Sequence, residues 1–271
     1  LDTPGRKTAD DHWQYMRDDL NVNAREMSPL FAKVLLARNE TKNIGELLSD
    51  WDFKETVDSP AASIFQETYR NLVELVFKDE LGDEVFSSFF KNNYFWQERF
   101  RLMLKQGKSA WFDDISTDNK TETVTELIRR AGLKTIADLS GRIGGEPDTW
   151  HWGKIHQIEF LNPLRREGPG KKWLGGGVHP MAGSGDTILR AFYPLENDNN
   201  IVQYSAALRM VADLSDNEKV AAVLPGGVSG RTFTAHFDDQ IRAYMDGEKR
   251  YWWFSDEAIK AHAVSELQLT P

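Results

Sequence analysis

The residues of this chain that could carry chemistry lie mainly in its second half. His151 and His156 are five positions apart, and paired histidines bind metal when both rings reach one side of an element. A separation of five places the side chains on opposite faces of a strand, and about 140° apart on a helix. Neither geometry makes a two-ligand site. The pattern therefore favours two ordinary polar residues, and we expect no metal ligand.

Two further groups resemble hydrolytic machinery. His236 is followed by Asp238 and Asp239, which could form an acid–base pair, but acidic residues are also favoured at the start of a helix. Ser229 lies in a glycine-rich turn. A nucleophile elbow needs glycine two residues after the serine, and Arg231 stands there. We therefore expect a structural role for His236 and no nucleophile at Ser229.

One predicted strand carries two charged residues of opposite sign, Arg209 and Asp213. Over residues 205–213 one face carries Ala206, Leu208, Met210 and Ala212, and the other carries Ser205, Ala207, Arg209, Val211 and Asp213. This pattern fits a sheet that lines a cavity, or equally a sheet half-buried under polar helices. Arg209 and Asp213 are about 13 Å apart at the usual strand rise, so each needs another partner.

Cofactor signatures are weak. The glycine-rich stretches 175–177 and 183–185 are not followed by Gly-Lys-Ser or Gly-Lys-Thr, so neither matches a phosphate loop. The chain contains no cysteine, which excludes disulfides, thiolate metal sites and a cysteine nucleophile. We expect no cofactor to be bound by residues of this chain.

The elements that position these residues are helical in the first half. Thr8 and the dipeptides Ser28-Pro29 and Ser59-Pro60 have the composition of helix starts. After Ser59-Pro60 an apolar stripe predicts an amphipathic helix that reaches Val76. Two more helices are expected, over 94–104 and 121–139. In the stripe we expect Ile64, Phe65 and Leu72 to be buried, and Glu67, Arg70 and Glu74 to be exposed.

The second half changes to strand patterns. Strands are expected over 154–160, 187–193, 202–213 and 219–224, followed by helices over 236–245 and from Ser255 to Ala263. Helices followed by strands are typical of an α+β fold, not an alternating α/β fold. We expect a helical subdomain over residues 1–145 and a β-rich part with terminal helices over 146–271.

Composition narrows the class of partners. Among 271 residues, 33 are Lys or Arg and 42 are Asp or Glu, which gives a net charge of −9. Nucleic-acid binding depends on clustered cations, so nucleic acid is not an expected partner. No apolar run reaches the roughly 18 residues of a membrane span, so no membrane association is expected.

Several motifs together form a family pattern. They are Pro225-Gly226-Gly227-Val228-Ser229-Gly230, then His236-Phe237-Asp238-Asp239-Gln240, then Gly247, with the strand 208–213 before them. Upstream are Trp150-His151-Trp152-Gly153 with His156, the glycine turn 183–187 and the helix expected within 8–30. This pattern resembles the penicillin acylase family and covers essentially the whole chain.

The resemblance implies an N-terminal-nucleophile hydrolase. In that family the precursor cleaves itself and exposes a serine as the first residue of a β subunit. The serine attacks a linear amide, with its own α-amino group as base, and forms an acyl-enzyme. The resemblance also implies a four-layer αββα sandwich, calcium in the full-length protein, and a periplasmic or secreted location. The substrate would be a small acylated amide, for example a β-lactam or an N-acyl-homoserine lactone.

The chain departs from the family pattern at its first residue, which is Leu1 and not serine. The family's nucleophile, oxyanion-hole asparagine and calcium ligands lie upstream of the helix at Thr8. We therefore expect the C-terminal portion of a β subunit, inactive alone, with no catalytic residue of its own. Its sheet would be covered by the missing N-terminal portion or by self-association. Among the positions with a role in catalysis, only one is matched. Asp213 stands where some family members have a carboxylate that orients a histidine near the nucleophile.

A rival hypothesis assigns no catalysis. Nine Trp, seven Tyr and fifteen Phe could supply stacking platforms for sugars or aromatic ligands. The chain would then be a stand-alone ligand-binding module.

Overall fold

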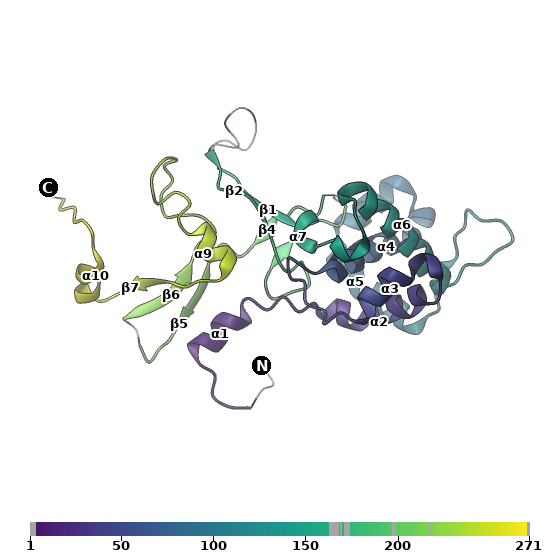
Figure 1. Ribbon diagram of the computed structural model, residues 1–271, viewed down its shortest axis with the longest axis horizontal. Helices are drawn as coiled ribbons and strands as arrows, with labels where there is room; N and C mark the ends of the chain where they lie inside the picture. The colour runs from purple at the N-terminus through teal and green to yellow at the C-terminus, as the bar shows by residue number, and fades with distance from the viewer. Residues whose placement is uncertain are drawn as a thin grey trace. The chain divides into compact units, whose positions relative to one another are not determined.

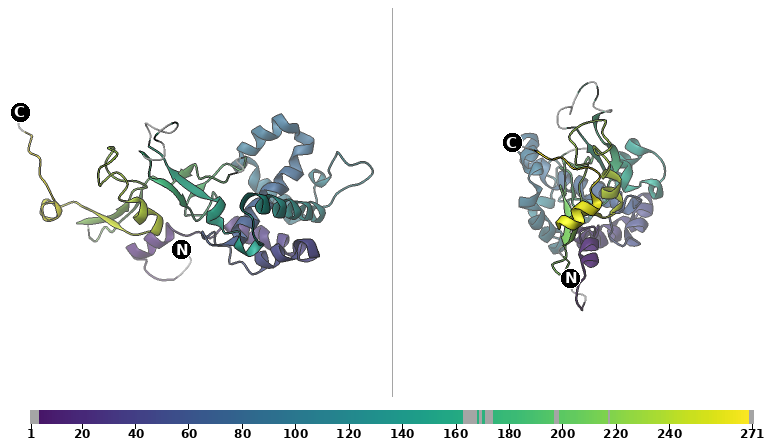
Figure 2. Two further views of the ribbon diagram at one scale, coloured as in Figure 1. Left: turned by 45° about the horizontal axis from the view of Figure 1, so that its top comes forward. Right: turned by 90° about the vertical axis from the view of Figure 1, so that its left-hand side faces the viewer.

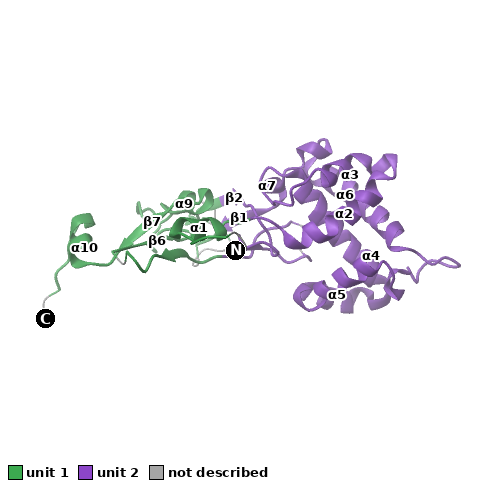
Figure 3. Ribbon diagram, turned by 90° about the horizontal axis from the view of Figure 1, so that it is seen from below, with its two compact units in different colours: residues 1–18, 160–177, 206–271 green, residues 19–159, 178–205 purple. Residues whose placement is uncertain are grey.

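The computed structural model describes residues 4–162, 168, 170, 174–196, 199–216 and 218–269. The chain separates into two compact units (Figure 3), one of residues 1–18, 160–177 and 206–271 and a larger one of residues 19–159 and 178–205. Helices dominate up to Ile143 and strands begin at Gln157, which confirms the α+β class. The expected boundary at residue 145 follows this change in secondary structure, whereas the units divide the chain by compactness.

The larger unit is mainly helical. Its helices are α2 (Val22–Leu36), α3 (Lys42–Ser49), α4 (Pro60–Lys91), α5 (Asn93–Gln106), α6 (Val124–Ile143) and α7 (Trp152–Ile155), with short 3₁₀ turns at Asn39–Thr41, Ala110–Phe112 and Pro147–Thr149. Helices α2 and α3 pack together, as do α4 and α6 (Figures 1 and 2). Helix α4 bends at Gly82, which has a φ of 68° that only glycine adopts readily.

The predicted stripe of α4 forms the centre of this core. Ile64, Phe65 and Leu72 are buried, as expected. The prediction for Glu67 is wrong, because that side chain is only 1% exposed. Helix α6 covers it, and Arg142 of α6 donates to one of its carboxylate oxygens at 3.1 Å. Arg70 donates to the other oxygen, also at 3.1 Å. The side chains of Arg70 and Glu74 are 15% and 30% exposed, so they are partly buried and not exposed as predicted.

The expected helix start at Ser28-Pro29 is also wrong. Helix α2 begins after Asn21, whose side-chain oxygen accepts the Ala24 N–H at 2.7 Å, and it continues through Pro29. A proline inside a helix removes one backbone hydrogen bond. Here the cost is offset by the apolar face, since Met27, Phe31 and Leu35 on both sides of Pro29 are buried.

Two short two-stranded sheets follow the helices of the larger unit in the sequence. The expected strand 154–160 is helix α7 followed by β1 (Gln157–Phe160), which pairs with β2 (Gly177–Pro180). The expected strand 187–193 is reduced to β3 (Ala191–Phe192), which pairs with β4 (Tyr204–Ser205) in antiparallel register.

The smaller unit holds a three-stranded antiparallel sheet. Its order is β5 (Arg209–Ala212), β6 (Lys219–Val223) and β7 (Arg250–Trp253), and β7 was not expected from the sequence. Helices α1 (Ala9–Tyr15) and α9 (Ile241–Asp246) lie beside this sheet (Figure 1), and α10 (Asp256–His262) follows β7. Thr8 and Ser255 cap α1 and α10, as their types predict. Among the described helices, none has the length and apolar character to cross a membrane.

Candidate functional site

The glycine turn and the histidine segment of the smaller unit bind each other. The N–H of Ser229 donates to the carbonyl of His236 at 2.9 Å, and the N–H of Gln240 donates to the carbonyl of Gly226 at 2.9 Å. Gly227 lies against the same backbone, and a Cβ there would be 2.0 Å from the carbonyl oxygen of His236. The motif is therefore a structural clasp in which only glycine fits at position 227. We call residues 226–240 the signature clasp.

The signature clasp also positions α9. The expected helix 236–245 begins later, at Ile241, because residues 236–240 form the clasp. Gln240 is buried, and its side-chain oxygen accepts the N–H of Leu224 at 3.1 Å. The helix ends at Gly247, where φ is 74° and a Cβ would lie 1.9 Å from Cζ of Arg17. Gly227 is thus explained by close backbone packing, and Gly247 by its positive φ and the Arg17 side chain that packs over it.

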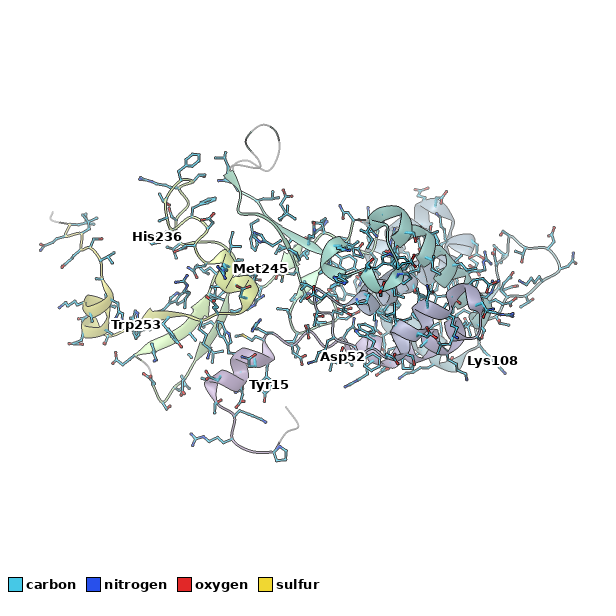
Figure 4. All side chains as sticks on the ribbon, in the orientation of Figure 1. Tyr15, Asp52, Lys108, His236, Met245 and Trp253 are labelled. Atoms are coloured by element: carbon cyan, nitrogen blue, oxygen red, sulfur yellow. The ribbon has the colours of Figure 1, made fainter. Side chains whose placement is uncertain are left out.

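His236 and Ser229 do not form a nucleophilic pair. The Nδ1 atom of His236 lies 3.0 Å from a carboxylate oxygen of Asp239, with the two side chains 66% and 35% exposed. Figure 4 shows His236 on the loop before α9. The Ser229 hydroxyl accepts the N–H of Arg231 at 3.1 Å, which is a local turn contact. The structural interpretation of both residues agrees with this geometry.

Arg209 and Asp213 occupy unlike environments. Arg209 is 3% exposed, whereas Met210 on the opposite face of the strand is 47% exposed, so the face that carries Arg209 is the covered one. The reason is α9, because Tyr244 covers Arg209 with its ring. Asp213 is exposed and accepts hydrogen bonds from the Ser215 N–H and hydroxyl at 2.9 and 2.7 Å. These hydrogen bonds hold the pKa of Asp213 below its usual value.

The two histidines of the Trp-rich motif differ in exposure. His156 is fully buried, stacks on Trp152 at 4.3 Å, and its Nδ1 lies 2.9 Å from the carbonyl oxygen of Asn200. Burial lowers the pKa of His156 to about 3, so the ring is neutral at physiological pH. His151 is 42% exposed and lies 3.8 Å from Asp58. Within the described residues, no three His, Asp or Glu side chains gather as metal ligands would.

Sequence reasoning missed a buried carboxyl group in the larger unit. Glu55 is completely buried, and one of its oxygens accepts hydrogen bonds from the side-chain amides of Asn21 at 2.8 Å and Gln66 at 2.5 Å. Burial raises the pKa of Glu55 to about 7, although these hydrogen bonds oppose the shift. Asp186 is a second acidic neighbour, and burial raises its pKa too. Gln66 stands on the polar side of the helix predicted after Ser59-Pro60, so its position gave no signal of this contact.

A cleft of about 920 Å³ lies beside α4 and α6 in the larger unit. Its walls carry charged residues, but these are engaged with one another. Lys134 lies 2.9 Å from Asp138 and 3.9 Å from Glu74, and Arg142 binds Glu67 at 3.1 Å. The cleft therefore shows an ion-pair network and no arranged nucleophile.

Comparison with known proteins decides the family. The family described as penicillin amidase matches residues 1–261. The chain belongs to the penicillin amidase family. The signature clasp lies within the matched residues, and the family resemblance inferred from the motifs is confirmed.

Individual relatives of this penicillin amidase chain are acylases. Acyl-homoserine lactone acylase QuiP of Pseudomonas aeruginosa is 24% identical over 253 residues, which cover 86% of this chain and 29% of that protein. Penicillin acylase 2 proenzyme of Pseudomonas sp. is 30% identical over 122 residues, 44% of this chain and 16% of that protein. Both relatives are acylases by name, and the chain spans less than a third of their length.

A solved structure shows the same fold. Thermostable penicillin G acylase from Alcaligenes faecalis has a TM-score of 0.57 and 17% identity to this chain. The match covers 96% of this chain and 48% of that chain. The fold of this penicillin amidase chain is therefore similar to about half of a solved penicillin acylase chain.

Proposed function

We propose that this chain is the C-terminal part of a hydrolase that cleaves linear amide C–N bonds. The catalytic nucleophile would be an N-terminal serine that is not in this chain. The observation that carries the proposal is the family match over residues 1–261, which includes the signature clasp. It is supported by the local geometry, because Ser229 and His236 are held in turn contacts and make no nucleophile–base pair.

The substrate belongs to the class of small acylated amides. Relatives of this chain act, by their names, on acyl-homoserine lactones or penicillins. Both substrate types contain a linear amide next to a ring. We extend the family's properties to the full-length protein, namely a calcium ion held by residues outside this chain and a periplasmic or secreted location.

The partner of this chain is the polypeptide that carries the nucleophile. In the described part of the chain, β5 and β7 each pair only with β6. Met210 on β5 and Tyr251 on β7 are 47% and 44% exposed. Strand edges and apolar side chains of this kind recruit another chain. Self-association through the same strands is the expected behaviour when that polypeptide is missing, and in the complete protein Asp213 would orient a histidine near the serine.

A second candidate is the binding module without catalysis. The observation in its favour is an exposed aromatic ladder on the larger unit. Tyr94 stacks on Phe192 at 5.7 Å, and Phe192 lies 5.8 Å from Tyr204. Tyr94 and Tyr204 are 56% and 65% exposed. Such rings suit stacking with a sugar or an aromatic ligand.

The two candidates differ in amide turnover. We expect no hydrolysis of phenylacetyl or N-acyl-homoserine lactone amides by this chain alone, because acyl transfer needs an activated nucleophile. Turnover is expected from the longer polypeptide that contains both this chain and the N-terminal serine. If the longer polypeptide is also inactive on the whole panel of linear amides, the proposed function fails and the binding module is favoured.

A further inference from the structure

Arg209 is a buried cation in the smaller unit. It is 3% exposed, and one of its nitrogens donates to the carbonyl oxygen of Tyr244 at 2.5 Å. Its guanidinium carbon lies 3.8 Å from the centroid of the Tyr244 ring. Neither partner carries a negative charge, and no described carboxylate forms an ion pair with Arg209. A buried guanidinium without a counter-anion is unfavourable.

The acidic residues of the neighbouring helices are engaged elsewhere. Asp10 of α1 forms an ion pair with Lys249. Asp11 takes part in the N-terminal cap of α1. Asp246 of α9 lies 3.3 Å from Arg242. The described residues of α1 and α9 therefore place no carboxylate in an ion pair with Arg209.

A second guanidinium lies beside the same helix end. The Arg17 side chain packs over Gly247, which ends α9. No described residue forms an ion pair with Arg17 either, and its positive charge acts against that of Arg209. The carbonyls at the C-terminal end of α9 carry partial negative charge, and one of them accepts a hydrogen bond from Arg209. The two guanidinium groups nevertheless repel each other. An oxyanion offsets such repulsion, and the planar guanidinium fork matches a carboxylate best.

We infer that Arg209, with Arg17 beside it, forms a carboxylate-binding site, occupied in the whole protein by a carboxylate side chain from the rest of the polypeptide. The inference rests on the proposed function in one respect, that a longer polypeptide surrounds this chain. The chain spans 29% of one relative and 48% of the penicillin G acylase chain, so such a polypeptide has ample length to supply the group. The remaining guanidinium nitrogens of Arg209 are not among the fully enclosed polar atoms that lack a partner.

Acetate serves as the probe for the isolated chain. In about 0.2 M sodium acetate at neutral pH, we expect its Tm to be about 2–4 °C above that in the same concentration of sodium chloride, because a ligand of the native state stabilises it. Arg209→Met should abolish this difference. Arg231→Met, which removes an exposed arginine of the same unit, should leave it unchanged. If Arg209→Met does not fold, Arg17→Met should still reduce the acetate response.

Two results would overturn the site itself, namely no acetate response in the wild-type chain, or an equal response in Arg209→Met. The longer polypeptide tests the occupant. There the acetate-specific difference between wild type and Arg209→Met should vanish, because the site is already filled. If that difference persists, the occupant is a free small carboxylate and the assignment to the polypeptide is wrong. No readout is amide hydrolysis, so a failure here is distinguishable from a failure of the proposed function.

Discussion

Replacing Leu72 with alanine is expected to lower the free energy of unfolding of the larger unit by about 2–5 kcal/mol. Leu72 is fully buried at the centre of α4, within the aromatic and aliphatic core of this unit. Its truncation removes apolar contacts and leaves a cavity that rigid helices fill only in part. Urea denaturation followed by far-UV circular dichroism measures the change.

The matched control for Leu72 is Leu133→Ala. Leu133 lies on α6 and is 36% exposed, so its truncation creates a smaller cavity. We expect it to cost clearly less than Leu72→Ala. A loss below about 0.5 kcal/mol for Leu72→Ala would contradict the packing of α4 described above, because buried leucines cost several times more.

Stability of the larger unit is expected to fall as pH rises, through Glu55. Its pKa is about 7 in the folded chain, compared with the ordinary value of 4.5. A group whose pKa is raised by folding stabilises the folded state fully at pH values below its pKa in the unfolded chain. This stabilisation is lost as the pH rises through its pKa in the folded chain. Between pH 4.5 and about pH 7, the free energy of unfolding should fall by about 3 kcal/mol. Glu55→Gln keeps the shape and the accepting oxygen and removes the titration.

The measurement for Glu55 is the difference between wild type and Glu55→Gln in free energy of unfolding, from pH 4.5 to pH 8. The difference should change in favour of the glutamine variant with rising pH, because the ionised carboxylate is buried beside Asp186. Glu46→Gln is the control, since Glu46 is exposed on α3. Parallel pH curves for wild type and Glu55→Gln would show that Glu55 does not titrate in this range.

Local signals in the sequence were sufficient for the helix starts that depend on neighbouring residues. Ser59 caps α4 by accepting the Ala62 N–H at 3.2 Å, and this needs only a serine, a proline and the next turn. Glu67 could not be placed in this way, because its burial depends on Arg142, which is 75 residues distant in the sequence. Strand β7 was missed for the same reason, since its pairing with β6 brings Tyr251 beside Ala221.

Of the residues in the candidate site, some could be found from the sequence and others could not. The glycines of the signature clasp were found through the resemblance to the family motif, and for Gly227 the structure supplies the reason in the carbonyl of His236. Alternation along the strand placed Arg209 and Met210 on opposite faces, but it could not show which of the two faces the rest of the fold covers. Glu55 left almost no local trace, because its amide partners come from separate segments of the chain.

In the proposed hydrolase, the catalytic nucleophile lies outside this chain. The most direct test of this proposal is covalent labelling of the longer polypeptide with a serine-reactive sulfonyl fluoride, followed by peptide mass spectrometry. We expect the label on an N-terminal serine upstream of residue 1 of this chain, with amide hydrolysis lost in proportion to labelling. A label on Ser229, with activity lost in Ser229→Ala, would contradict the account.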